Sequence, residues 1–188
     1  VGFPEPNAFT LLGEALRQLG RSEEAREVLE AGLKKHPGDA QLEARLGSTL
    51  LDLDDARRAV EHLARARTKL PRDAPTLTVY AAALMASGRA EEAEAQVTRA
   101  LLLGGGNDTR LVLAMIKVRR GQHAEAESLA RQVDGASSVP TLQMAARALI
   151  ADLLVLRGEA KAAWALWQEL EAAGQVAPHQ VARVAWAA

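Results

Sequence analysis

The chain contains no cysteine, only 3% aromatic residues and no long apolar run. The lack of cysteine excludes a disulfide scaffold, a thiolate metal site and a cysteine nucleophile. Because no apolar run reaches the roughly 18 residues of a membrane span, and no signal-peptide pattern is present, we expect no membrane insertion by this segment. The 23 basic and 24 acidic residues give a formal net charge of −1, which offers no general attraction to nucleic acid. We expect a soluble protein, with the cytoplasm and the periplasm both open as its compartment.

Helix-forming residues make up much of what is present. The 188 residues include 39 alanines and 28 leucines, and long runs of β-branched residues are missing. Alanine and leucine are among the best helix formers, so the composition predicts an all-α fold. The length suits one domain or one short array of repeats.

Similar residues recur at intervals of 34 along the first half of the chain. The recurring sets are Pro37 and Pro71; Gly20, Asp54 and Gly88; Ala25, Ala59 and Ala93; Leu29, Leu63 and Val97; and Leu12, Leu46 and Tyr80. Within one interval, one apolar stripe of helical period is followed by a turn and a second stripe, which predicts a pair of helices. One helix pair cannot bury its apolar stripe alone, so neighbouring pairs must stack.

These units resemble tetratricopeptide (TPR) repeats. The resemblance is carried by the large-small pairs Leu12-Gly13, Leu46-Gly47 and Tyr80-Ala81, by the alanines at the 34-residue interval, and by the prolines that close the first two units. It implies a right-handed α-solenoid of antiparallel helix pairs forming a single array over residues 1–188. The expected repeats cover about 6–39, 40–73, 74–107, 108–139 and 140–177, followed by a terminal helix over 178–188.

The fourth and fifth units depart from the pattern. In the fourth, Ala114-Met115 is placed at the large-small positions with Met115 where a small residue is usual, and Asp108 is expected to cap the helix. Gly121 then comes one residue early. In the last unit, Trp164 and Trp167 are expected to fill the final helix interface. The unpaired terminal helix favours a fragment of a longer array.

Catalytic and metal-binding patterns are missing from the sequence. The four histidines form no i, i+4 ligand pair, and the glycines at 104–106 lack the Gly-Lys-Ser/Thr ending of a phosphate-binding loop. Carboxylates cluster near predicted helix starts, where they suit the helix dipole. Arginines alternate with acidic residues, which disfavours a nucleic-acid surface. We therefore expect neither an enzyme nor a bound cofactor or metal.

The TPR resemblance implies that the first helix of each pair lines a concave groove. Thr10, Glu14 and Arg45 stand at groove positions where some TPR proteins hold a peptide carboxylate with lysine and asparagine, so that clamp is missing. The groove residues expected to contact a partner are Arg45, Thr78, Ala82, Met85, Val112, Ile116, Arg119, Ala148 and Asp152. Such a mixed surface suits an amphipathic helix or an extended apolar segment. An alternative stays open, in which these side chains pack between adjacent first helices.

The function expected from these features is a non-enzymatic scaffold that binds a protein or peptide partner on the concave face of units two to five. On that basis, Ile116→Asp should weaken partner binding and leave the helix content intact. Two alternatives stay open: an accessory domain of a larger bacterial enzyme or secretion and envelope-assembly machine, and a scaffold that self-associates through its terminal helices. The composition, rich in alanine, arginine and leucine, suggests a bacterial source.

Overall fold

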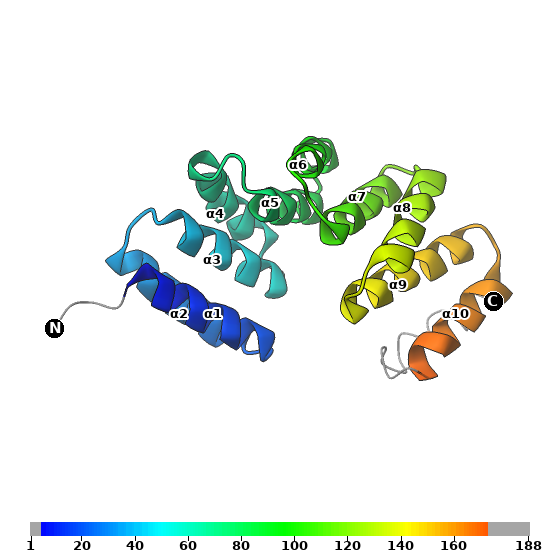
Figure 1. Ribbon diagram of the computed structural model, residues 1–188, viewed down its shortest axis with the longest axis horizontal. Coiled ribbons are helices and arrows are strands. Elements are labelled where there is room, and N and C mark those ends of the chain that lie inside the picture. Colours follow the sequence, from blue (N-terminus) through cyan, green and yellow to red (C-terminus); the bar gives the residue numbers. More distant parts are fainter. Residues whose placement is uncertain (1–4, 173–188) are drawn as a thin grey trace. The chain divides into compact units, whose positions relative to one another are not determined.

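A computed structural model describes residues 5–172, and these form ten α-helices without any strand (Figure 1). The helices are α1 (Pro6–Gln18), α2 (Ser22–Lys35), α3 (Ala40–Asp52), α4 (Ala56–Lys69), α5 (Ala74–Ala86), α6 (Ala90–Leu102), α7 (Asn107–Arg119), α8 (His123–Ala136), α9 (Pro140–Leu156) and α10 (Ala160–Ala172). The predicted all-α architecture of five helix pairs is confirmed. The predicted terminal helix over 178–188 lies outside the described residues.

The chain divides into two compact units. Unit 1 is Val1–Gly105 and contains α1 to α6, and unit 2 is Gly106–Ala188 and contains α7 to α10. In each unit the most extensive contacts join the two helices of a pair or join one pair to the next. Stacking therefore buries the apolar stripes that a single pair would leave exposed.

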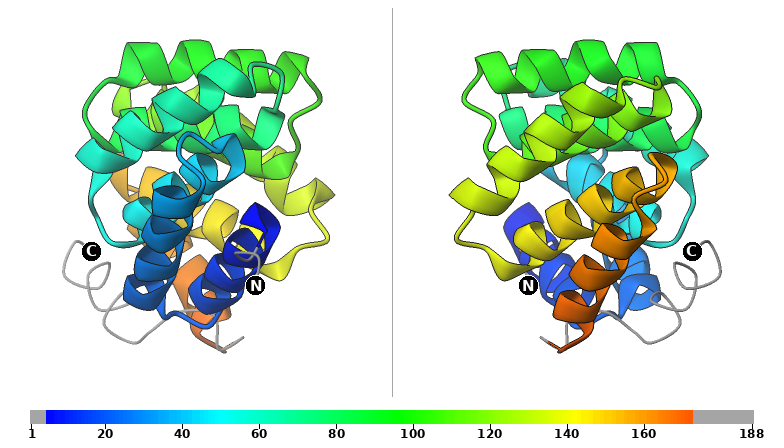
Figure 2. Two further views of the ribbon diagram at one scale, coloured as in Figure 1. Left: turned by 90° about the vertical axis from the view of Figure 1, so that its left-hand side faces the viewer. Right: turned by 90° about the vertical axis from the view of Figure 1, so that its right-hand side faces the viewer.

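Unit 1 consists of two layers of helices. Helix α3 contacts both α1 and α5, so these three helices form one layer, which we call the inner layer (Figures 1 and 2). Helices α2 and α4 lie outside it, each packing against its own partner and against the first helix of the next pair. In unit 2, α7 contacts α9 in the same way, while α8 packs against both. The inner layers therefore consist of the first helices of the pairs.

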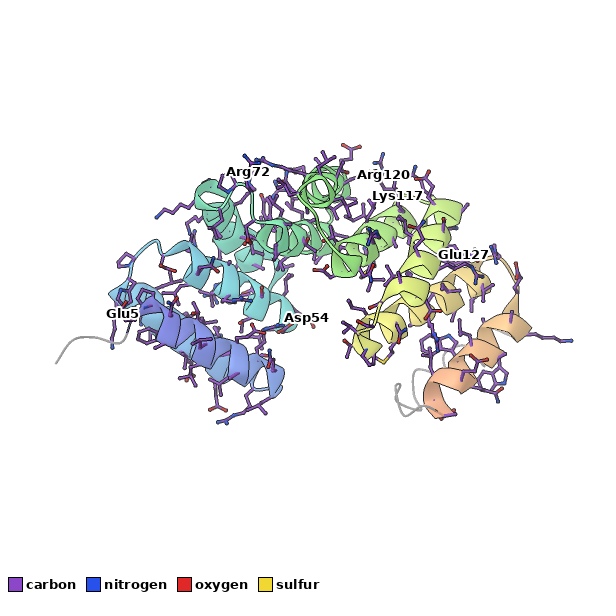
Figure 3. All side chains as sticks on the ribbon, in the orientation of Figure 1. Glu5, Asp54, Arg72, Lys117, Arg120 and Glu127 are labelled. Atoms are coloured by element: carbon purple, nitrogen blue, oxygen red, sulfur yellow. The ribbon has the colours of Figure 1, made fainter. Side chains whose placement is uncertain are left out.

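Helix ends carry side-chain caps and left-handed turns. The carboxylates of Asp39, Asp55 and Asp73 accept hydrogen bonds from the first turns of α3, α4 and α5. Between the two helices of a pair the chain passes through positive φ, which favours glycine. Asp54 occupies this position after α3 with a φ of 59°, the one non-glycine residue with positive φ in the described part of the chain (Figure 3). The residues at this position in the other four pairs are Gly20, Gly88, Gly121 and Gly158.

A glycine allows the two helices of the second pair to approach closely. A Cβ atom added at Gly47 would lie 2.4 Å from Cγ of Leu63, well inside normal contact. Leu63 is wholly buried, and Leu46, which precedes the glycine, is 1% exposed. The missing side chain of Gly47 thus makes the space that the Leu63 side chain fills.

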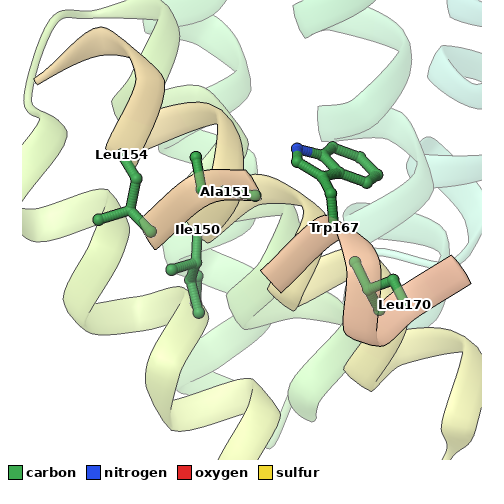
Figure 4. Packing of buried hydrophobic residues seen from close by; sticks show 7 residues of the cluster. Ile150, Ala151, Leu154, Trp167 and Leu170 are labelled. Carbon is green, nitrogen blue, oxygen red and sulfur yellow. The ribbon is translucent and has the colours of Figure 1, made fainter. Parts of the chain in front are cut away.

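A tryptophan lies in the hydrophobic cluster that joins α9 to α10 in unit 2. Trp167 on α10 is 6% exposed and packs in one cluster with Ile150 and Leu154 of α9 and with Leu170 (Figure 4). Trp164 is partly buried against the same cluster. The expectation that the two tryptophans fill the last helix interface is therefore confirmed.

Candidate functional site

A cavity of about 270 Å³ lies on the inner layer of unit 1, between α3 and α5. Its lining residues are Gln41, Ala44, Arg45, Ser48, Leu63, Asp73, Pro75, Thr76 and Val79. The residues at 41, 44, 45 and 48 lie on α3, and those at 75, 76 and 79 lie on α5. The two helices contact each other, which brings the two sets together. The lining is more polar than apolar: it combines the polar side chains of Gln41, Arg45 and Ser48 with a few apolar ones, so hydrogen bonds would contribute much of any binding there.

Arg45 is the charged side chain of this cavity that projects most freely. Its side chain is 46% exposed, and its Nη1 lies 3.5 Å from Oε2 of Glu14, at the limit of a hydrogen bond. In contrast, the Ser48 hydroxyl donates to the carbonyl of Ala44, and the Asp73 carboxylate accepts from the backbone N–H of Thr76. Since a guanidinium has five N–H donors, Arg45 can bind a further acceptor that enters the cavity.

A network of charged residues lies beside the cavity and joins α1 to α3. Arg17 Nη2 is 2.9 Å from Oε1 of Glu14, and Arg17 Nη1 is 3.2 Å from Oδ2 of Asp52. The hydrogen bond from Arg17 lowers the pKa of the Glu14 carboxyl below its ordinary value of 4.5. The same bond raises the pKa of Arg17. Glu14 is therefore held ionised next to Arg45.

We expect the stabilising effect of Glu14 to depend on pH. Its pKa is lower in the folded than in the unfolded chain, so its contribution is fully present above the unfolded pKa and is lost as the pH falls through the folded pKa. Glu14→Gln should reduce the free energy of unfolding by about 0.5–1 kcal/mol at pH 7. Urea unfolding of both proteins should show this difference shrinking below about pH 4.5. A difference that stays constant down to pH 2 would contradict the assignment.

The predicted groove residues of unit 1 differ in how accessible they are. Arg45 is exposed and lines the cavity, whereas Ala82 is half-buried. Thr78 and Met85 are only 4% and 8% exposed, and the Thr78 hydroxyl donates to the carbonyl of Ala74 on its own helix. For Thr78 and Met85, the structure favours the alternative in which they pack inside the protein.

The fourth repeat begins one residue earlier than its sequence pattern indicated. Helices α1, α3 and α5 begin at residues 6, 40 and 74, but α7 begins at Asn107. Asp108 therefore lies inside the first turn, and the residue before α7, Gly106, provides no side-chain cap. The buried residues of α7 match buried residues of α5 that lie 33 positions earlier. These pairs are Thr109 and Thr76, Leu111 and Thr78, Ala114 and Ala81, and Ile116 and Ala83.

The placement of Met115 at the small, buried position was therefore wrong. Ala114, which is wholly buried, takes that position, and Met115 is 39% exposed. Ile116 is wholly buried and not exposed on the groove, so Ile116→Asp should destabilise the fold and not leave the helix content intact. Met115 and Leu156, which is 61% exposed, are surface residues of the inner-layer helices that the sequence analysis did not include among the groove residues. The interval of 33 between Gly88 and Gly121 was the signal that could have located Met115.

The remaining predicted residues lie on the inner layer of unit 2. Arg119 and Asp152 are exposed at the C-terminal parts of α7 and α9. Val112 is half-buried, and Ala148 packs against the cluster that contains Trp167. The accessible part of this layer in unit 2 is therefore a mixture of charged and apolar side chains.

One carboxylate on α3 is buried and paired with side chains of α4. Glu43, at a position where the first and third repeats have Phe9 and Leu77, is 6% exposed. Its Oε2 lies 2.5 Å from Nδ1 of His62, and its Oε1 accepts from Nε of Arg65 at 3.0 Å. The group joins α3 to α4 and satisfies a carboxylate that would otherwise be costly to bury. His62 and Arg65 are three residues apart and so lie on one face of α4, a spacing from which this pairing could have been predicted.

Within residues 5–172, no three potential metal-ligating side chains come together. In the same part of the chain, no helix combines the length and the apolar character needed to cross a membrane.

Comparison with known proteins identifies the repeat. Residues 6–49 match one family model described as tetratricopeptide repeat, and residues 74–99 and 108–132 match another with the same description. The chain belongs to the tetratricopeptide repeat family. Among curated proteins, none matches this TPR chain in sequence.

Solved structures share the TPR fold over nearly the whole chain. A thermophilic TPR protein of Thermus thermophilus is 23% identical, with a TM-score of 0.80 over 97% of this chain and 98% of that one. PilW, a type IV pilus biogenesis factor, is 18% identical, with a TM-score of 0.80 over 99% and 87%. PilF of Pseudomonas aeruginosa is 22% identical, with a TM-score of 0.67 over 87% and 75%. TPR proteins are generally scaffolds for protein–protein interaction, and typically they are not enzymes.

Proposed function

We propose that this TPR protein is a non-enzymatic scaffold that binds a partner polypeptide on the inner layer of unit 1. The observation that carries the proposal is the cavity between α3 and α5, with the exposed guanidinium of Arg45 at its side. Pro75 and Val79 supply apolar contact on the α5 wall, and Ala44 supplies it on the α3 wall. These walls suit an extended segment that places an apolar side chain in the cavity and a carboxylate near Arg45.

The chemistry of the cavity also limits how tight the binding can be. Arg45 already lies near Glu14, so an incoming carboxylate competes with a resident one. The cavity holds only a few side chains, and association has its own entropic cost. We expect a dissociation constant in the micromolar range, of about 1–100 µM.

Unit 2 offers a second contact surface in the same proposal. Met115, Arg119 and Asp152 are exposed on its inner layer, and the half-buried Val112 and Ala148 lie on the same two helices. In unit 1, the half-buried Ala82 has the corresponding role. Binding to this surface of unit 2 would use Met115, whose flexible side chain adapts to different surfaces.

Peptide selection tests the proposal. A random displayed peptide library is selected on the 188-residue chain, and enriched peptides are measured by fluorescence anisotropy. The selection should enrich peptides that carry an acidic residue. Arg45→Glu and Val79→Glu should each weaken the binding of these peptides at least about tenfold. The matched control is Arg99→Glu on α6, an exposed arginine outside the cavity, which should bind as the parent does. Equal binding by all three variants, each with unchanged circular dichroism, would contradict the proposal.

A further inference from the structure

A second cavity, of about 560 Å³, lies at the edge of unit 1 where the chain turns within a helix pair. The turn from α3 to α4 and the turn from α5 to α6 meet there, and the Ser87 hydroxyl lies 3.3 Å from the carbonyl oxygen of Ala56. The lining residues are Asp54, Asp55, Ala56, Arg57, Val60, Glu61, Ser87 and Arg89. None of them lines the cavity near Arg45, so the two cavities are separate.

Two charged residues of this lining are paired with residues three positions further along the chain. The Asp55 carboxylate accepts from the backbone N–H of Arg58, and its Oδ2 lies 3.7 Å from Nη1 of Arg58. Nη2 of Arg89 lies 2.7 Å from Oε2 of Glu92. Each pair is close to neutral, so the charge of the cavity is set by the other charged residues of its lining.

The other three charged residues are exposed and form no ion pair with any part of residues 5–172. They are the carboxylates of Asp54 and Glu61 and the guanidinium of Arg57, which together carry a charge of −1. The antiparallel helices that end at this edge have opposed dipoles, so the side chains decide the sign of the local field. Val60, which is half-buried, adds an apolar wall. The cavity therefore favours a cation that also carries an apolar part.

Two residues of the cavity depart from the repeat. Asp54 stands where the other four pairs have glycine, although its φ of 59° lies in the left-handed region that is less favourable for a residue with a side chain (Figure 3). Val60 stands where the first and third pairs have the charged residues Arg26 and Glu94. Glycine would complete the turn without strain, so the turn itself does not require the carboxylate of Asp54. Both departures give the cavity the acidic and apolar groups that set it apart from its counterparts in the repeat.

From these observations we infer that this cavity binds an arginine side chain of a partner polypeptide. A guanidinium has five N–H donors and can bond the carboxylates of Asp54 and Glu61 at the same time, while its aliphatic stem packs against Val60. Lysine fits less well, because its compact and strongly hydrated ammonium lacks the planar fork. The unpaired Arg57 favours a partner that has an acidic residue beside the arginine. This site goes beyond the proposed function, since it selects a positive charge and the cavity near Arg45 selects a carboxylate.

Nuclear magnetic resonance titration with a short peptide tests this site. The probe is acetyl-Gly-Arg-Gly-amide, whose blocked ends leave no carboxylate for the cavity near Arg45. With the ¹⁵N-labelled chain of 188 residues, we expect a dissociation constant of about 1–10 mM and shifts centred on the backbone amides of residues 54–61 and 87–89. The same peptide with citrulline in place of arginine has nearly the same shape without the charge, and it should bind at least about tenfold more weakly.

Variants separate this cavity from a general attraction of cations to acidic side chains. Asp54→Gly restores the residue of the other pairs, and Glu61→Gln keeps the shape of the side chain; each should weaken binding of the arginine peptide at least about fivefold. Glu27→Gln is the matched control, because Glu27 occupies the position of Glu61 one repeat earlier and is likewise exposed, and it should bind as the parent does.

Three results would overturn the inference. They are equal binding of the arginine and citrulline peptides, shifts centred outside the cavity, and equal effects of Glu61→Gln and Glu27→Gln. Arg45→Ala should leave binding of the arginine peptide unchanged, because Arg45 lines the other cavity. Failure of this inference is therefore distinguishable from failure of the proposed function, which is measured with acidic peptides.

Discussion

Replacement of Ile116 by aspartate is expected to lower the free energy of unfolding of unit 2 by about 4 kcal/mol. Ile116 is wholly buried, so the carboxylate would lose its hydration without gaining a partner, and the apolar contacts of the isoleucine would be lost as well. Urea unfolding followed by circular dichroism measures the change as a lower midpoint, or as loss of helix at zero denaturant.

The neighbouring methionine is the control for this prediction. Met115 is 39% exposed, and Met115→Asp should change the free energy of unfolding by no more than about 0.5 kcal/mol. The two variants carry the same charge one position apart on α7, so helix propensity and net charge cancel in the comparison. A larger loss for Met115→Asp than for Ile116→Asp would restore the register in which Met115 occupies the small position.

Gly47 and Leu63 give the second large effect. Leu63→Ala should lower the free energy of unfolding by about 3 kcal/mol, because it empties a wholly buried site. Gly47→Ala should lower it by about 1–2 kcal/mol, although alanine is the better helix former by about 1 kcal/mol. The reason is the contact of 2.4 Å that the new Cβ would make with Cγ of Leu63.

The double variant reverses the sign of the glycine substitution. In the Leu63→Ala background the obstructing Cγ is gone, so Gly47→Ala should raise the free energy of unfolding by about 1 kcal/mol through helix propensity. Denaturant midpoints of the four proteins complete the cycle. If Gly47→Ala has the same effect in both backgrounds, the space at Gly47 does not limit the approach of α3 and α4.

The fold of this protein is predictable from its sequence because large and small side chains recur at fixed intervals in the repeat. The large-small pair Leu46-Gly47 and the large Leu63 are read from their 34-residue intervals, whereas the structure shows that Leu63 is the side chain that fills the space at Gly47. The capping role of Asp39 and Asp73 is similarly local, since each carboxylate bonds within its own helix turn. Such features depend on neighbours three or four positions away, where periodicity is informative.

The register of α7 was less accessible because the shift falls among glycines. Residues 104–106 are identical and carry no side chain, so nothing there marks which residue is missing. Placing the shift after α7 made Ile116 a surface residue and Met115 a buried one. Both are apolar, so composition could not distinguish them, and burial did.

The candidate site was predicted only in part for a related reason. Arg45 has a distinctive charge and was identified, whereas Ala44 and Ser48 line the cavity by being small. A cavity is a property of what two helices leave unfilled, and small residues serve equally well for close packing. Thr78 and Met85 show the other side of this ambiguity, since they were expected on the groove and lie buried.

Among the described residues of each unit, every helix makes its substantial contacts with helices one or two places along the chain. A helix pair that is gained or lost therefore affects only its neighbours. In a sheet, by contrast, a new strand must pair with strands that can lie far away in the sequence. Duplication of a gene fragment that encodes one pair would therefore lengthen the protein without requiring compensating changes elsewhere. Relatives with different numbers of pairs can arise in this way in few evolutionary steps.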